Sequence, residues 1–63
     1  MLVILADGPK QGEFYEIPDG TENGVFPVIL TEDHKYAYAE YMLVPARTRL
    51  NERMARLLRM VER

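Results

Sequence analysis

The chain contains few side chains that could carry out covalent chemistry. It has no cysteine and no serine, so threonine and tyrosine hydroxyls are the remaining oxygen nucleophiles besides carboxylates. His34 is the single imidazole, and its neighbour Asp33 would give a metal ion two adjacent ligands without a third. We therefore expect a non-enzymatic protein without a metal or other cofactor, in which His34 lies in an exposed turn.

Carboxylates are more plentiful, and two pairs of them suggest the acid and base of a hydrolase: Glu13 with Glu16, and Asp7 with Asp19. Nothing in their spacing requires either pair to meet, and 63 residues leave little room for a substrate cleft. The glycines of residues 7–12 suggest a phosphate-binding loop, but the G-x-x-x-x-G-K-[ST] order is missing and no helix follows. We interpret this run as a hairpin loop.

Arginine has the most informative distribution along the chain. Residues 46–63 carry six arginines against two glutamates, a net charge of +4, whereas residues 1–45 carry eight acids against two lysines, a net charge of −6. The two parts add to the overall charge of −2. Guanidinium groups bind phosphates and carboxylates, so the expected partner-binding residues are Arg49, Arg53, Arg56 and Arg59.

The element expected to position these arginines is a C-terminal amphipathic helix over residues 46–63. All four prolines and all four glycines lie at or before position 45, which favours strands and turns there and a helix after it. At 100° per residue the apolar side chains of the last segment form one wide stripe. Thr48 is a candidate N-cap. The stripe gives the expected interface residues: Leu50, Met54, Leu57, Leu58 and Val61.

The preceding residues predict three or four antiparallel strands. Residues 2–5 form an apolar run, and residues 13–17 form a second strand-like run after a set of turn residues, so we expect the two to pair as a hairpin. A third strand over residues 25–31 contains Pro27, which favours an edge position or a bulge. The alternating run 36–44 is apolar on both sides and is placed centrally. The predicted fold class is therefore α+β, with a small antiparallel sheet and the helix across one face, in a single domain over residues 1–63.

Size favours self-association. A chain of 63 residues buries only about 60% of the surface that its unfolded form exposes, and this one has no disulfide to support it. The apolar stripe is also wider than one sheet face requires. We expect a homo-oligomer that has a possible host protein as a further partner, with nucleic acid as the less favoured alternative because the first 45 residues repel a polyanion.

No targeting signal is expected at the start of the chain. The apolar run of residues 1–6 ends at Asp7, shorter than a signal peptide or a membrane-spanning helix requires. We expect a cytoplasmic protein that does not bind membranes.

The first 20 residues resemble a recurrent type of short uncharacterised protein from actinobacteriophages and their hosts. Those proteins combine an apolar strand, a G-G-P-x-D-G turn, a second strand and a P-x-G turn. The matching residues here are 2–5, then Asp7-Gly8-Pro9-Lys10-Gln11-Gly12, then Ile17-Pro18-Asp19-Gly20. Asp7 replaces the first glycine of the turn, and Gln11 replaces its aspartate. The resemblance implies a phage-encoded accessory protein made in the host bacterial cytoplasm, and it supplies no functional residues.

Together these observations predict a non-enzymatic phage accessory protein, a self-associating interaction module that binds a host macromolecule. The alternative is a small nucleic-acid-binding protein that uses the arginine-rich segment.

Overall fold

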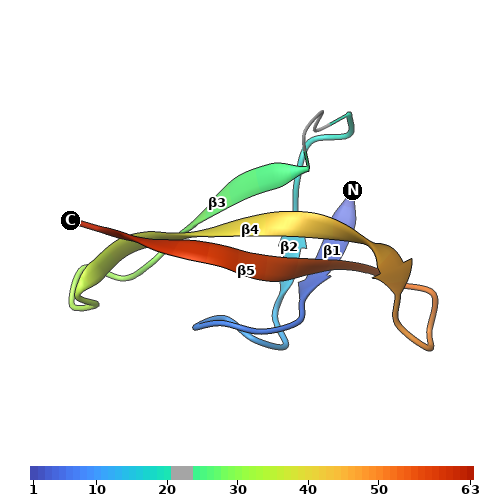
Figure 1. The fold of residues 1–63 in the computed structure, drawn as a ribbon, viewed down its shortest axis with the longest axis horizontal. Helices are drawn as coiled ribbons and strands as arrows, with labels where there is room; N and C mark the ends of the chain where they lie inside the picture. Colours follow the sequence, from blue (N-terminus) through green and yellow to red (C-terminus); the bar gives the residue numbers. More distant parts are fainter. Residues whose placement is uncertain (21–23) are drawn as a thin grey trace.

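The fold is a single five-stranded sheet, seen in a computed structural model that describes residues 1–20 and 24–63. The strands are β1 (Leu2–Leu5), β2 (Phe14–Glu16), β3 (Val25–Ile29), β4 (Tyr36–Arg47) and β5 (Arg53–Glu62). Their order across the sheet is β2-β1-β5-β4-β3, so the last strand in sequence is the central one. Figure 1 shows the long β4–β5 pair, with β1 and β2 crossing it steeply.

The predicted α+β class is wrong, because residues 1–20 and 24–63 contain no helix. The sheet is mixed: β5 pairs antiparallel with β4 and parallel with β1. Two smaller predictions are confirmed. β1 and β2 pair antiparallel as a hairpin, and β3 lies at a sheet edge with Pro27 in it.

The expected amphipathic helix over residues 46–63 is instead the end of β4, a turn and β5. Residues rich in helix formers adopt a strand here because β5 fills the gap between two other strands, and such tertiary pairing overrides local propensity. The turn is also marked in the sequence. Asn51 has a φ of 64°, a left-handed conformation that asparagine tolerates better than most residues.

A register shift in β5 explains why its pattern suggests a helix. Tyr41 lies opposite Leu57 and Glu40 lies opposite Arg59, so Leu58 is the extra residue of a β-bulge. The bulge lets Leu57 and Met60, three positions apart, both pack against the core. A spacing of three is what a helix would require for one face, and the bulge produces it within a strand.

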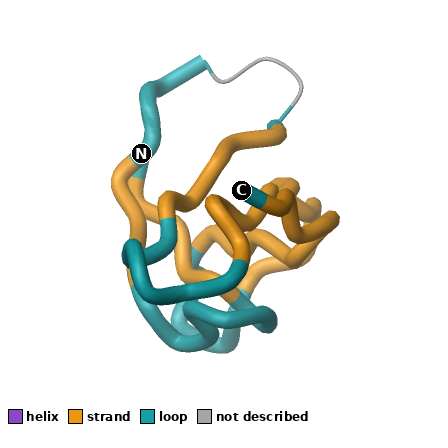
Figure 2. The backbone as a smooth tube through the Cα atoms, turned by 90° about the vertical axis from the view of Figure 1, so that its left-hand side faces the viewer, coloured by secondary structure: helices purple, strands orange, loops and turns teal. Residues whose placement is uncertain are grey.

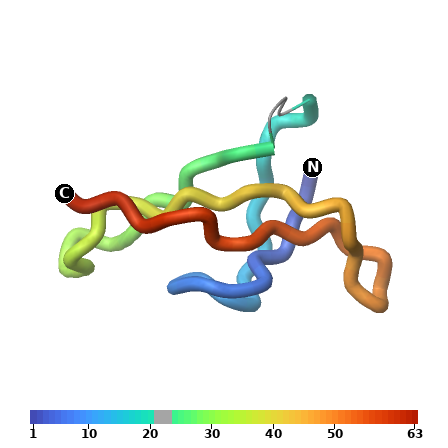
Figure 3. The backbone as a smooth tube through the Cα atoms, viewed as in Figure 1, coloured from blue at the N-terminus to red at the C-terminus, as the bar shows by residue number. Residues whose placement is uncertain are grey.

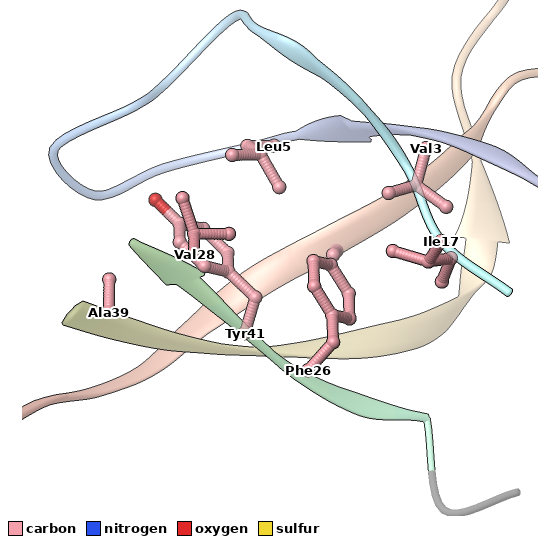
Figure 4. Close-up of a cluster of buried hydrophobic side chains, with 8 residues drawn as sticks. Val3, Leu5, Ile17, Phe26, Val28, Ala39 and Tyr41 are labelled. Atoms are coloured by element: carbon pink, nitrogen blue, oxygen red, sulfur yellow. The ribbon is translucent and has the colours of Figure 1, made fainter. Parts of the chain in front are cut away.

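The sheet curls, as the end-on view of the backbone in Figure 2 shows. Buried side chains from the different strands pack together in one cluster on its inner face. In Figure 4 the Phe26 and Tyr41 rings lie together at the centre, with their centroids 6.2 Å apart and an interplanar angle of 20°. The core cluster consists of Val3, Leu5, Ile17, Phe26, Val28, Ala39, Tyr41 and Ala55. Because all five strands or their ends contribute, no strand can be removed without opening this core.

Pro27 stands where β3 can accept it. The N–H of Leu30 donates to the carbonyl of Ala37, and the N–H of Leu43 donates to the carbonyl of Gly24. In an antiparallel ladder the backbone N–H and C=O groups of alternate residues point to the same neighbour. Those of the even-numbered residues of β3 therefore point toward β4, and the backbone nitrogen of residue 27 points away from it. Proline therefore costs no ladder hydrogen bond at this position and leaves one fewer donor on the free edge.

Candidate interaction surface

The second face of the sheet, opposite the core, is also apolar. Strand alternation and the register place Phe14, Ile4, Met54 and Val44 in one row across four strands, with Met42 and Val25 in the next row. We call these six residues the outer patch. Phe14 and Met42 are 48% and 40% exposed, and Leu2 beside Ile4 is 56% exposed. An antiparallel sheet that has one face in water normally carries polar residues there, so this face has the composition of a covered one.

The five expected interface residues fall into three places. Met54 lies in the outer patch, and Val61 lies on the same face opposite Tyr38. Leu58 is 49% exposed at the bulge, and Leu50 is 80% exposed at the tip of the β4–β5 turn. Leu57, in contrast, packs against the core cluster. The structure therefore does not bring the five together on one stripe, because a strand alternates where a helix would align them.

The arginines divide into two groups. Arg56 and Arg59 lie on the outer face and are paired: Arg56 Nε is 3.5 Å from Asp7 Oδ2, and Arg59 Nε is 2.9 Å from Glu40 Oε1. The hydrogen bond that Arg59 donates to Glu40, together with the negative charge of that carboxylate, raises the pKa of the Arg59 guanidinium above its ordinary value. These pairs neutralise the charges that border the outer patch.

The second group belongs to the β4–β5 turn. Arg53 lies directly opposite Arg47, and Arg49 follows within the turn. Among residues 1–20 and 24–63, none of these three forms an ion pair. The four arginines expected to bind a partner, Arg49, Arg53, Arg56 and Arg59, therefore do not form one continuous basic face.

Asp7 joins parts of the chain that the sequence pattern gave no reason to connect. Its Oδ1 accepts a hydrogen bond from the backbone N–H of Leu57, and its backbone carbonyl accepts one from the Tyr41 hydroxyl at 2.8 Å. Burial raises the pKa of Tyr41 above its ordinary value, since the charged phenolate is disfavoured there. Gly8 adjoins this contact, and a Cβ at Gly8 would lie 2.5 Å from Tyr41 Oη. The loop that begins at Asp7 therefore connects the end of β1 to β4 and β5 by hydrogen bonds.

The histidine and the carboxylates considered from the sequence contact other groups and not one another. His34 Nδ1 accepts a hydrogen bond from the Tyr36 backbone N–H, and Glu13 Oε2 lies 3.9 Å from Lys10 Nζ. Glu16 and Asp19 both lie near the ammonium group of Met1, and Asp7 lies near Arg56. Neither carboxylate pair considered from the sequence is brought together by these contacts.

In the described part of the chain no cluster of three potential metal ligands occurs and no pocket is present. No helix within those same residues is long and apolar enough to cross a membrane. The outer patch and the basic turn remain as the surfaces with a distinctive chemistry.

Comparisons with known proteins give no counterpart. No protein-family profile matches the chain, and neither a curated protein nor a solved structure gives a significant match.

Proposed function

We propose that this protein is a self-associating interaction module, and that a second copy covers the outer patch. The observation that carries the proposal is the apolar character of both sheet faces. Protein domains bury each apolar face of a sheet against a second layer, and no element within residues 1–20 and 24–63 covers this one. A second copy offers the same apolar face in return.

Charge supports a contact between like copies. Two identical surfaces meet without repulsion only if each is close to neutral, and the arginines at the border of the patch are paired with Asp7 and Glu40. A two-fold contact would keep these pairs or exchange them between copies. A strongly acidic or basic partner would gain little electrostatic attraction from these charge pairs, because each is already neutralised.

The size of the molecule sets an upper limit on this contact. Its two longer extents are 34 and 23 Å, so a complete face is needed to match the roughly 800 Å² that each partner buries in a stable dimer. The total accessible surface is 4432 Å², so covering a complete face would remove a substantial part of the surface of a chain whose core is small.

The resemblance of the first 20 residues supports the wider proposal of a phage accessory protein that acts in the host cytoplasm on a host macromolecule. A dimer of this kind would present its edges, turns and basic hairpin in duplicate. Non-enzymatic action is part of the same proposal.

The experiment is absolute mass by light scattering over a range of protein and salt concentrations. We expect about twice the mass of 7.3 kDa, resistant to salt because the contact is apolar. Phe14→Lys or Met42→Lys should give a folded monomer, since a charge would be placed in a desolvated contact. Circular dichroism establishes that each variant is folded.

Leu50→Lys is the matched control, because Leu50 is an exposed leucine at the turn, away from the patch. Its mass should equal that of the unchanged protein. A wild-type monomer at all concentrations would refute the proposal, and so would dissociation by Leu50→Lys combined with intact dimers of Phe14→Lys and Met42→Lys.

A further inference from the structure

The β4–β5 turn concentrates positive charge that the described chain leaves unpaired. Arg47, Arg49 and Arg53 lie within seven residues, and Glu52 is the one acid among them. The Glu52 carboxylate accepts a hydrogen bond from the Thr48 hydroxyl at Oε1, 2.7 Å away, and within the described part of the chain it forms no ion pair with these arginines, so the turn has a net charge of +2. This differs from Arg56 and Arg59 farther along β5, each of which has its own carboxylate.

Arg47 and Arg53 are placed so that they repel each other. They are direct cross-strand partners, so their side chains leave the hairpin on the same face, where like charges are destabilising. Arg53 Nε is also buried without a hydrogen-bond acceptor. An anion between the two guanidinium groups would relieve this repulsion.

The backbone of the turn is held in one shape by its own hydrogen bonds. Thr48 Oγ1 accepts from the N–H groups of Leu50 and Glu52 at 3.2 and 3.1 Å. Arg47 Nη1 donates to the carbonyl of Asn51 at 2.8 Å. The arginines are therefore carried on a pre-ordered hairpin, which reduces the entropy lost on binding. Figure 3 shows this hairpin at one end of the molecule, opposite the turn between β3 and β4.

We propose that this hairpin binds the phosphate backbone of duplex nucleic acid. Guanidinium groups match phosphate oxygens in bidentate geometry, and a backbone of closely spaced phosphates can satisfy three arginines at once. A two-stranded ribbon is narrow enough to enter the major groove of DNA. The site is separate from the outer patch, so the proposal does not depend on self-association.

The test measures the binding of a short fluorescent DNA duplex to the full chain by anisotropy, from about 50 to 200 mM salt. Three phosphate contacts predict a slope of log K against log salt of roughly −2.7 for each hairpin engaged. Arg49→Gln should reduce the steepness of this slope by about 0.9 per hairpin and weaken binding to all sequences alike. Arg47→Gln should reduce the slope by the same amount and weaken binding further, because it also removes the hydrogen bond from Arg47 to the Asn51 carbonyl that helps to order the turn.

Arg59→Gln is the control, since the same substitution there removes a guanidinium that already has Glu40 as its partner. It should leave the slope unchanged. Absence of binding at the lowest salt would overturn the proposal, as would equal effects of Arg59→Gln and Arg49→Gln. An acidic peptide that binds more tightly than the duplex would also overturn it and would assign the hairpin to a protein carboxylate partner.

Discussion

The carboxylate of Asp7 accepts a hydrogen bond from the backbone N–H of Leu57, with 2.6 Å between Oδ1 and N. Fifty positions separate these residues in sequence. The contact fixes the start of the β1–β2 loop against β5 one residue before the bulge at Leu58. A polar loop residue thereby helps to determine where the register of the central strand changes.

Removing that carboxylate should destabilise the fold. We expect Asp7→Ala to reduce the free energy of unfolding by about 1–2 kcal/mol, because a half-exposed charged acceptor is lost from a backbone donor. Asp7→Asn should cost less, since an acceptor oxygen remains. Urea denaturation at fixed protein concentration measures both. Asp33→Ala, in an exposed turn, serves as the control, and a loss there equal to that of Asp7→Ala would contradict the assignment.

Gly8 and Gly12 form a natural matched pair. Both have positive φ, 83° and 88°, but a Cβ at Gly12 would meet nothing within 4 Å. Gly12→Ala should therefore cost only the backbone strain, about 1 kcal/mol. Gly8→Ala should cost more, because the new methyl group would collide with Tyr41 Oη. If thermal denaturation shows equal losses, the close approach of the loop to Tyr41 is not present in solution.

The alkaline limit of stability should depend on Tyr41. Its pKa is raised in the folded state by burial, so the folded protein retains the phenolic proton more strongly than the unfolded chain. The corresponding stability is complete below about pH 10, the ordinary pKa of tyrosine, and is lost as the pH rises above it. Tyr41→Phe should lower stability by about 1 kcal/mol at neutral pH through loss of the bond to Asp7.

The same variant should lose less additional stability between neutral pH and about pH 11 than the unchanged protein. Urea midpoints at the two pH values give the comparison. Tyr36→Phe, which removes a tyrosine hydroxyl outside the core cluster, provides the reference. A Tyr41→Phe profile parallel to the wild-type profile would refute the role of Tyr41.

Pro27 should protect the free edge of β3. Pro27→Thr would add an N–H that points away from β4 and would raise the strand propensity of an exposed edge. We expect the fold to persist, because no ladder bond is involved, and aggregation on prolonged incubation to increase. Turbidity and light scattering measure this, with Lys35→Thr in the adjoining turn as the control. Unchanged aggregation would mean that the edge is already protected by other means.

The first 45 residues were predictable to a useful degree because their signals are local. A run rich in β-branched residues, a second short run and the Gly- and Pro-containing turns after them predicted the β1–β2 hairpin, and the edge position of β3 is one of the two places that Pro27 favoured. The structure of residues 46–63 was not predictable in this way. Arg, Met, Leu and Glu favour helices locally, and the bulge at Leu58 places apolar residues at the spacing that is typical of a helix. The decisive contact, the parallel pairing of Ile4 with Met54, joins residues 50 positions apart.

The candidate surfaces were predictable only in composition. The sequence shows that arginines gather in the last segment, but their division depends on Asp7 and Glu40, which are distant acids. It also could not place Leu57 in the core and Leu58 at the surface, because that difference arises from a single bulged position. The prediction of Thr48 as a helix N-cap is wrong: its Oγ1 accepts hydrogen bonds within the β4–β5 turn instead. Asn51, a residue type that tolerates positive φ, is the turn signal that the sequence contained.

The position of β5 has a consequence for how the protein folds. The strand at the centre of the sheet follows all the others in sequence, and without it the β1–β2 and β3–β4 hairpins have no common neighbour. Isolated hairpins are marginally stable in water, so the β1–β2 and β3–β4 hairpins should stay largely unfolded until residues 53–62 have left the ribosome. Folding should then be a late, single cooperative event, slowed by the long loops that must close before β5 contacts β1.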